Sequence, residues 1–135
     1  MSDLVLFDTS VLIDHFRTNG HAGRLSALTA IVQNSSVVLS ELWRGIRTRE
    51  EAEFMEVFQR QHPVLVPGEE DWLLSGKILL EIRKIKGFEA GKLRDLHFDV
   101  LIALTARAHG ARLITSTRDD FELIRQCCDF QLEVW

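Results

Sequence analysis

The 135-residue sequence has no long apolar run and only two cysteines. No stretch approaches the ~18 consecutive apolar residues of a membrane-spanning helix, so no membrane association is expected. The short apolar run near the N-terminus follows no basic segment, which argues against a signal peptide. Cys127 and Cys128 are adjacent, and neighbouring cysteines rarely bridge to each other. We therefore expect no disulfide framework and a reducing, cytoplasmic location.

The sequence also has fewer basic than acidic residues. The sequence has 16 Lys and Arg against 20 Asp and Glu, which gives a net charge of −4. Such a chain is not a general binder of polyanions, and it can act on nucleic acid only where a cation or a local basic patch reverses the sign. Repeats and low-complexity tracts are absent as well. The composition is 46% hydrophobic and 27% charged, and together with the length it predicts one globular domain over residues 1–135.

Short apolar runs alternate with longer segments of helical spacing. Strands are expected at residues 4–7, 37–39, 64–66 and 113–114, with an edge strand at 130–134. Helices are expected over residues 50–61, 69–86 and 97–109, with Gly87 and Gly110 ending the last two. Two glycines and mixed charge predict a mobile loop over residues 87–96. The alternation predicts an α/β fold, with a mainly parallel sheet of four or five strands covered by helices on both faces.

Acidic residues follow the expected strands. Asp8 comes directly after the first strand, Glu41 follows the second, and Asp119 and Asp120 follow the strand at 113–114. Asp99 is expected in the first turn of the helix that leads into that strand. Ligands of open parallel sheets bind outside the carboxyl ends of the strands, so we expect these acids to lie at one edge of the sheet.

Each acid alone has a simpler explanation, because Asp and Glu commonly cap helix N-termini. Together, converging carboxylates repel each other and raise one another's pKa, which a bound cation would relieve. Oxygen-only ligands favour Mg²⁺ or Mn²⁺. Zinc is disfavoured, because the histidines are scattered and form no zinc-binding spacing: His15, His21, His62, His97 and His109.

Three segments resemble the motifs of PIN-domain nucleases. LVLFDTSVLIDHF is similar to the opening strand and Asp-Thr/Ser motif of that family, and VVLSELWRGIR to its second motif. FDVLIALTARAHGARLITSTRDDFELI is similar to the third and fourth motifs. The motifs occur in order and span residues 4–124. The compact length is similar to that of the VapC toxins of prokaryotic type II toxin–antitoxin modules.

The resemblance implies an endoribonuclease that depends on Mg²⁺ or Mn²⁺, with an RNA substrate, a cognate antitoxin and a homodimeric state. The implied catalytic and metal-binding acids are Asp8, Glu41, Asp99 and Asp120, with Asp119 replacing Asp120 if the loop is one residue longer. The implied supporting residues are Ser10, Thr115 and Thr117, where Ser10 orients Asp8 or accepts a metal-bound water.

Basic residues near these motifs are candidates for RNA binding. Arg44 and Arg47 follow Glu41 and would share a helix face if the helix continues, while Arg118 lies inside the fourth motif and could hold a phosphate. A second basic group is more simply explained as a solvated face: Arg83, Lys84, Lys86, Lys92 and Arg94.

Two other classes share parts of this pattern. A phospho-acceptor receiver domain has a similar length and acids at strand ends, but it needs paired acids after the first strand and a late lysine, and here Lys92 is the last lysine. Haloacid-dehalogenase-like phosphatases need Asp-x-Asp after the first strand, whereas position 10 is Ser. A catalytically silent binding protein of the same fold has the same sequence pattern, and an assay is needed to separate it from a nuclease.

Overall fold

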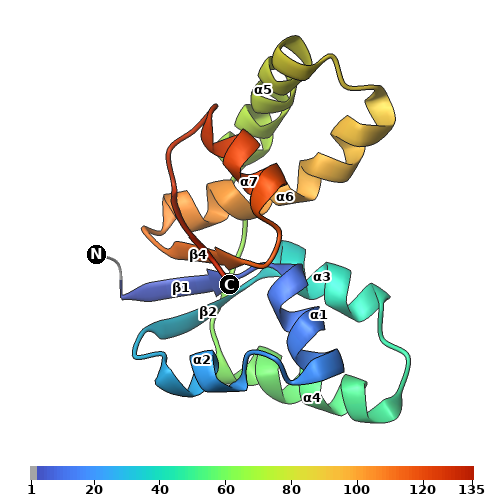
Figure 1. The fold of residues 1–135 in the computed structure, drawn as a ribbon, viewed down its shortest axis with the longest axis vertical. Helices are drawn as coiled ribbons and strands as arrows, with labels where there is room; N and C mark the ends of the chain where they lie inside the picture. Colours follow the sequence, from blue (N-terminus) through green and yellow to red (C-terminus); the bar gives the residue numbers. More distant parts are fainter. Residues whose placement is uncertain (1–2) are drawn as a thin grey trace.

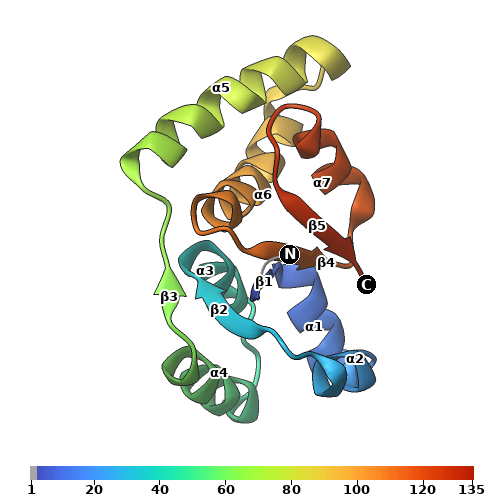
Figure 2. The ribbon, with the colours of Figure 1, turned by 90° about the vertical axis from the view of Figure 1, so that its left-hand side faces the viewer.

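The computed structural model describes residues 3–135, and its centre is a five-stranded sheet in the order β3-β2-β1-β4-β5. Every pair of neighbouring strands is parallel. The strands are β1 (Leu4–Phe7), β2 (Ile31–Ser35), β3 (Val64–Leu65), β4 (Arg112–Thr115) and β5 (Gln131–Val134). Figure 2 shows β3 and β5 at opposite edges, with β1 between β2 and β4 in the middle.

Helices lie on both sides of the sheet. They are α1 (Thr9–Thr18), α2 (Ala22–Ala27), α3 (Ser36–Arg44), α4 (Arg49–Gln61), α5 (Glu69–Lys86), α6 (Ala90–Ala108) and α7 (Arg118–Arg125). In Figure 1, α5, α6 and α7 lie above the strands, and α1, α2 and α4 lie below them. None of the helices in residues 3–135 has the length and hydropathy to cross a membrane. The parallel sheet with helices on both sides confirms the expected α/β fold.

The core explains why the central strands are short apolar runs. Val5, Leu6 and Phe7 are all buried, because helices cover both faces of β1. In α6, every residue from Val100 to Ala106 is buried. This part of α6 is therefore enclosed on all sides over about two turns.

The expected strand at residues 37–39 is wrong. These residues lie in α3, and the second strand is β2, six residues earlier. The helix begins where the Ser35 hydroxyl accepts a hydrogen bond from the backbone N–H of Val38, 3.3 Å away. Val38 and Leu42 then pack into the core one turn apart. A short apolar run fits a buried strand or a buried helix equally well, and here the serine cap selects the helix.

The expected loop at residues 87–96 is also wrong, and it is mostly helix. Only residues 87–89 connect α5 to α6, which begins at Ala90. Gly87 ends α5 with a φ of 65°, as expected of a C-terminal glycine. Gly91 lies in the first turn of α6, where a glycine disturbs few helical hydrogen bonds. Asp99 consequently lies in the middle of α6 and not in its first turn.

Candidate active site

Asp8 lies at the carboxyl end of the central strand, and 4% of its surface is exposed. Its backbone N–H donates to the carbonyl of Ile114 at 2.9 Å, which ties it to the end of β4. Its side chain also accepts from the backbone N–H of Val11 at 3.4 Å, so it caps α1. The cap explains part of its position, but burying a charged carboxylate requires more hydrogen bonds than this one.

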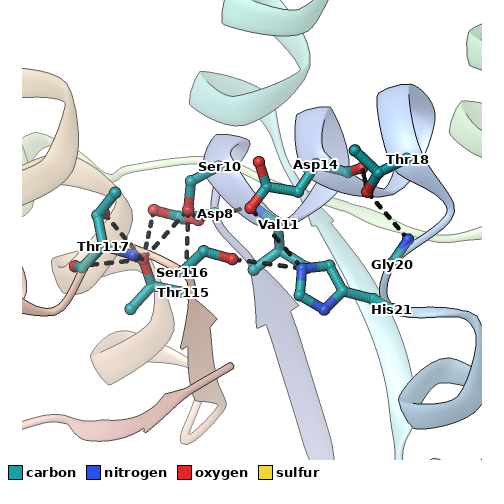
Figure 3. A network of polar contacts seen from close by, with 10 residues as sticks. All are labelled: Asp8, Ser10, Val11, Asp14, Thr18, Gly20, His21, Thr115, Ser116 and Thr117. Atoms are coloured by element: carbon teal, nitrogen blue, oxygen red, sulfur yellow. Dashed lines mark hydrogen bonds and ion pairs between the residues drawn. The ribbon is translucent and has the colours of Figure 1, made fainter.

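Two hydroxyl groups hold the Asp8 carboxylate from both sides (Figure 3). Ser10 Oγ donates to Oδ1 at 2.5 Å, and Thr115 Oγ1 donates to Oδ2 at 2.8 Å. Each hydroxyl in turn accepts a backbone N–H from the turn after β4, Ser116 N to Ser10 at 3.0 Å and Thr117 N to Thr115 at 3.0 Å. This hydroxyl clamp fixes the orientation of the carboxylate. Burial nevertheless raises the pKa of Asp8, although the two hydroxyls lower it.

Glu41 approaches Asp8 from a helix and not from a strand end. It lies on α3, and its Oε1 accepts a hydrogen bond from the hydroxyl of Thr9 at 2.9 Å. Burial raises its pKa, and the negative charge of Asp8 raises it further, while Thr9 and Arg44 lower it. The prediction that Glu41 follows a strand is wrong, but the residue lies close enough to Asp8 for their charges to interact.

Asp99 is the acid most affected by the others. Burial and then the negative charges of Asp8, Glu41 and Asp120 raise its pKa to about 7. Among the groups that shift the pKa of Asp99, only the positive charge of Lys92 lowers it. The structure therefore brings four acids from four elements together: α6 carries Asp99, and α7 carries Asp120.

The two acids of the fourth motif differ in their surroundings. Asp120 is partly buried, its Oδ1 lies 3.3 Å from Lys92 Nζ, and its charge acts on Asp99. Asp119 is exposed, and its charge is not among those that shift Asp99. The geometry therefore favours Asp120 as the fourth acid of the cluster.

The donor set fits a hard divalent cation in its chemistry. Its side chains offer carboxylate and hydroxyl oxygens. Burial raises the pKa of Asp8, Glu41 and Asp99, and neighbouring acids raise the pKa of Glu41 and Asp99 further. As the side chains stand in residues 3–135, no three His, Cys, Asp or Glu residues are arranged to hold a metal ion directly. Glu41 and Asp120 instead bond to Thr9 and Lys92. Direct coordination would therefore require these side chains to turn.

A hollow of about 470 Å³ lies beside Glu41, between α1, α3 and the start of α4. Glu41 lies on its wall, together with Arg44, Arg47 and Arg17. Because α3 ends at Arg44, the expected helix face shared by Arg44 and Arg47 does not form, yet both side chains line this hollow. Arg118 begins α7 and is exposed.

Thr9 and Arg17 have no role assigned from the sequence, and Lys92 is interpreted there only as part of a solvated basic face. Thr9 could have been found, because it directly follows Asp8 and belongs to the same Asp-Thr motif. Lys92 lies 28 positions from its partner Asp120, so only the packing of α6 against α7 reveals the pair. Arg17 reaches the hollow from α1 and lies four residues after Ile13, which also lines it.

The sequence matches the PIN domain family over residues 5–125, and the chain belongs to this family. No curated protein matches the sequence significantly.

Several solved structures have a similar fold. DNA-bound VapBC from Salmonella typhimurium matches with a TM-score of 0.73 and 23% identity, covering 100% of this chain and 99% of that one. VapBC2 from Rickettsia felis, bound to a DNA fragment from its promoter, matches with a TM-score of 0.72 and 21% identity, and 98% of each chain is covered. VapBC-1 from nontypeable Haemophilus influenzae matches with a TM-score of 0.71 and 24% identity, again over 98% of each chain. The likeness extends over the whole fold.

Proposed function

We propose that the protein is a metal-dependent endoribonuclease and the toxin of a toxin–antitoxin pair. The observation that carries the proposal is the convergence of Asp8, Glu41, Asp99 and Asp120, where burial and the charges of the other three acids raise the pKa of Asp99 to about 7. Such a cluster is stable only when a cation or a proton reduces its charge. The membership in the PIN domain family and the similarity to VapBC structures agree with it. The family membership also makes a receiver-type signalling domain the weaker alternative.

We assign the four acids different roles according to their positions in the cluster. Asp8 and Asp99 are the most buried of the cluster, and we assign them direct contact with Mg²⁺ or Mn²⁺. Glu41 and Asp120 are assigned to a second cation, to its waters, or to the attacking water. When bound, the divalent cation lowers the pKa of water and offsets phosphate charge. The hydroxyl clamp of Ser10 and Thr115, with Thr117 behind it, keeps Asp8 oriented.

The basic hollow beside Glu41 gives RNA a way to approach a chain of net negative charge. Its arginines would contact phosphates next to the scissile bond, and the exposed Arg118 at the start of α7 would contact a further phosphate. Each such contact releases counterions, so RNA binding should weaken as salt rises. The relatives named above were solved as VapBC complexes, and a cognate antitoxin is the corresponding partner for this chain.

The direct test is cleavage by the purified protein. We expect Mg²⁺ or Mn²⁺ to support cleavage of single-stranded or loop RNA, and EDTA to stop it, because the carboxylates alone cannot activate water. Gel analysis of a labelled RNA would measure it. Cleavage that persists in EDTA would contradict the mechanism, and no cleavage with either cation would favour a catalytically silent PIN-domain protein.

The surface of α5 supports a homodimer. The face of α5 opposite its buried residues Ser75, Ile78 and Ile82 is exposed and carries Leu73 and Leu80. Its first turn is acidic and its last turn is basic. Gly76 lies between the two leucines, and the space beside it is open. The face is therefore complementary to itself in the antiparallel direction, as a two-fold interface requires.

In such a dimer, an axis near Gly76 sets Leu73 opposite the partner's Leu80. The same axis sets Glu69 opposite the partner's Lys84. Leu73→Glu should then shift the protein to monomer in sedimentation velocity, whereas Ile85→Glu, on another side of α5, should not. Glu69→Lys and Lys84→Glu should each weaken the dimer, and the double exchange should restore it. A monomeric wild type, or a double exchange without recovery, would contradict this interface.

A further inference from the structure

His21 lies between α1 and α2, and 8% of its surface is exposed. Its Nε2 is 3.4 Å from Ser116 Oγ and 3.8 Å from Asp14 Oδ2, as Figure 3 shows. Its Nδ1 is buried and has no hydrogen-bond partner among the described residues. A buried histidine that directs one ring nitrogen toward a polar network and leaves the other unpaired requires an explanation.

The surroundings select one tautomer of the neutral ring. Nδ1 lacks a partner among the described residues in either tautomer, but Nε2 faces the carboxylate of Asp14, which can only accept a hydrogen bond. A proton on Nε2 can be donated to the hydroxyl of Ser116, with the carboxylate of Asp14 nearby as a second acceptor. His21 therefore acts as a donor toward Ser116.

Ser116 connects this contact to the acidic cluster. Its backbone N–H donates to Ser10 Oγ at 3.0 Å, and Ser10 Oγ donates to Asp8 Oδ1 at 2.5 Å. We infer that His21 is a positioning residue for the Asp8 carboxylate, acting through Ser116 and Ser10. By holding the Ser116 side chain, it keeps the backbone N–H directed at Ser10, which keeps the Ser10 hydroxyl directed at Asp8.

The packing around His21 reaches the other side of the hydroxyl clamp. The ring lies 5.5 Å from that of Trp135, which in turn lies 5.5 Å from the ring of Phe7, the residue before Asp8. The backbone N–H of Trp135 donates to the carbonyl of Thr115 at 2.8 Å. His21 and Trp135 thus pack behind both hydroxyls that hold Asp8. The packing role and the donor role of His21 must therefore be separated by experiment.

Two substitutions separate the packing role of His21 from its donor role. His21→Phe keeps an aromatic ring against Trp135 but has no donor, and His21→Gln loses the ring but keeps an N–H at a similar reach. In the metal-free protein, hydrogen exchange at the Ser116 amide should become faster in His21→Phe and stay close to wild type in His21→Gln. This readout does not depend on nuclease activity or on any bound cation.

The consequence for the site rests on the proposed function. The dissociation constant for Mn²⁺ should rise about tenfold in His21→Phe, as for other residues that orient a metal ligand, and should recover in His21→Gln. For RNA cleavage, kcat should fall while KM stays unchanged. Ser116→Ala should have the same effect, and adding it to His21→Phe should bring no further loss.

His15→Phe is the matched control, because His15 also has a buried Nδ1 without a partner in the described chain but lies by Phe16 and Phe54, away from Ser116. It should behave as wild type. Equal Ser116 exchange in His21→Phe and wild type would overturn the inference. A larger loss in His21→Gln than in His21→Phe would also overturn it, because it would make His21 a packing residue. If wild type binds no Mn²⁺, the proposed function fails. Hydrogen exchange at the Ser116 amide in the metal-free protein still tests the role of His21.

Discussion

Replacing Asp8 by Asn is expected to lower the rate of RNA cleavage on the order of 10²–10³-fold, the effect of losing several kcal/mol of transition-state stabilisation. The substitution removes the charge from the most enclosed acid of the cluster. It also places an amide where one of the donors, Ser10 or Thr115, requires an acceptor. Initial rates with Mn²⁺ and saturating labelled RNA would measure the loss.

Asp119→Asn is the matched control, because Asp119 is an exposed acid directly beside Asp120. It should cleave RNA at nearly the wild-type rate, whereas Asp120→Asn should be impaired. The account of the site would be wrong if Asp8→Asn kept the wild-type rate. The choice of Asp120 would be wrong if Asp119→Asn were the more impaired of the neighbouring pair.

Asp99→Asn is expected to stabilise the metal-free protein at pH 8. The pKa of Asp99 rises from 3.8 to about 7 on folding, so the folded state binds more protons than the unfolded state between these values. The free energy of unfolding of wild type should therefore fall as the pH rises through that window, and the full penalty should be present above it. Asn carries no titrating proton and removes the repulsion from Asp8, Glu41 and Asp120.

Thermal melts in EDTA from pH 5 to pH 8 would measure this effect. The melting temperature of wild type should drop across the window, and that of Asp99→Asn should stay flatter and higher at pH 8. Asp95→Asn serves as the control, because Asp95 is an exposed acid one turn earlier on the same helix. A steeper decline in Asp99→Asn than in wild type would mean that Asp99 is ionised and stabilising in the folded state.

The parts of the fold that sequence patterns predict well are those where burial and local signals agree. β1 and β4 are short, mainly apolar runs followed by polar residues, and α5 has apolar spacing with a glycine directly after it. The errors fall where local signals are ambiguous. The apolar run at residues 37–39 fits a strand or a buried helix, and the glycines before Leu93 suggest a loop where α6 in fact begins.

The grouping of the four candidate acids follows more directly from the sequence than the elements that carry them. The positions of Asp8 and Asp120 follow from the rule that parallel strands end at a common edge. Glu41 and Asp99 are also predicted members of the cluster, but Glu41 lies on α3 and not after a strand, and Asp99 lies in the middle of α6 and not in its first turn. Lys92 was not expected there, because its contact with Asp120 depends on how α6 packs against α7. Long-range packing of this kind leaves no local signal in the sequence.

The most direct test of the central claim is the shift in melting temperature that Mn²⁺ produces at pH 8 in wild type and in Asp99→Asn. If the four acids form one cation site, Mn²⁺ at a hundredfold excess over its dissociation constant should stabilise wild type by about 2.7 kcal/mol. The same concentration should stabilise Asp99→Asn much less, because one ligand charge is gone. An equal shift in both proteins, or a shift in neither, would show that the acids are separate helix caps and side-chain partners and not a metal-dependent catalytic site.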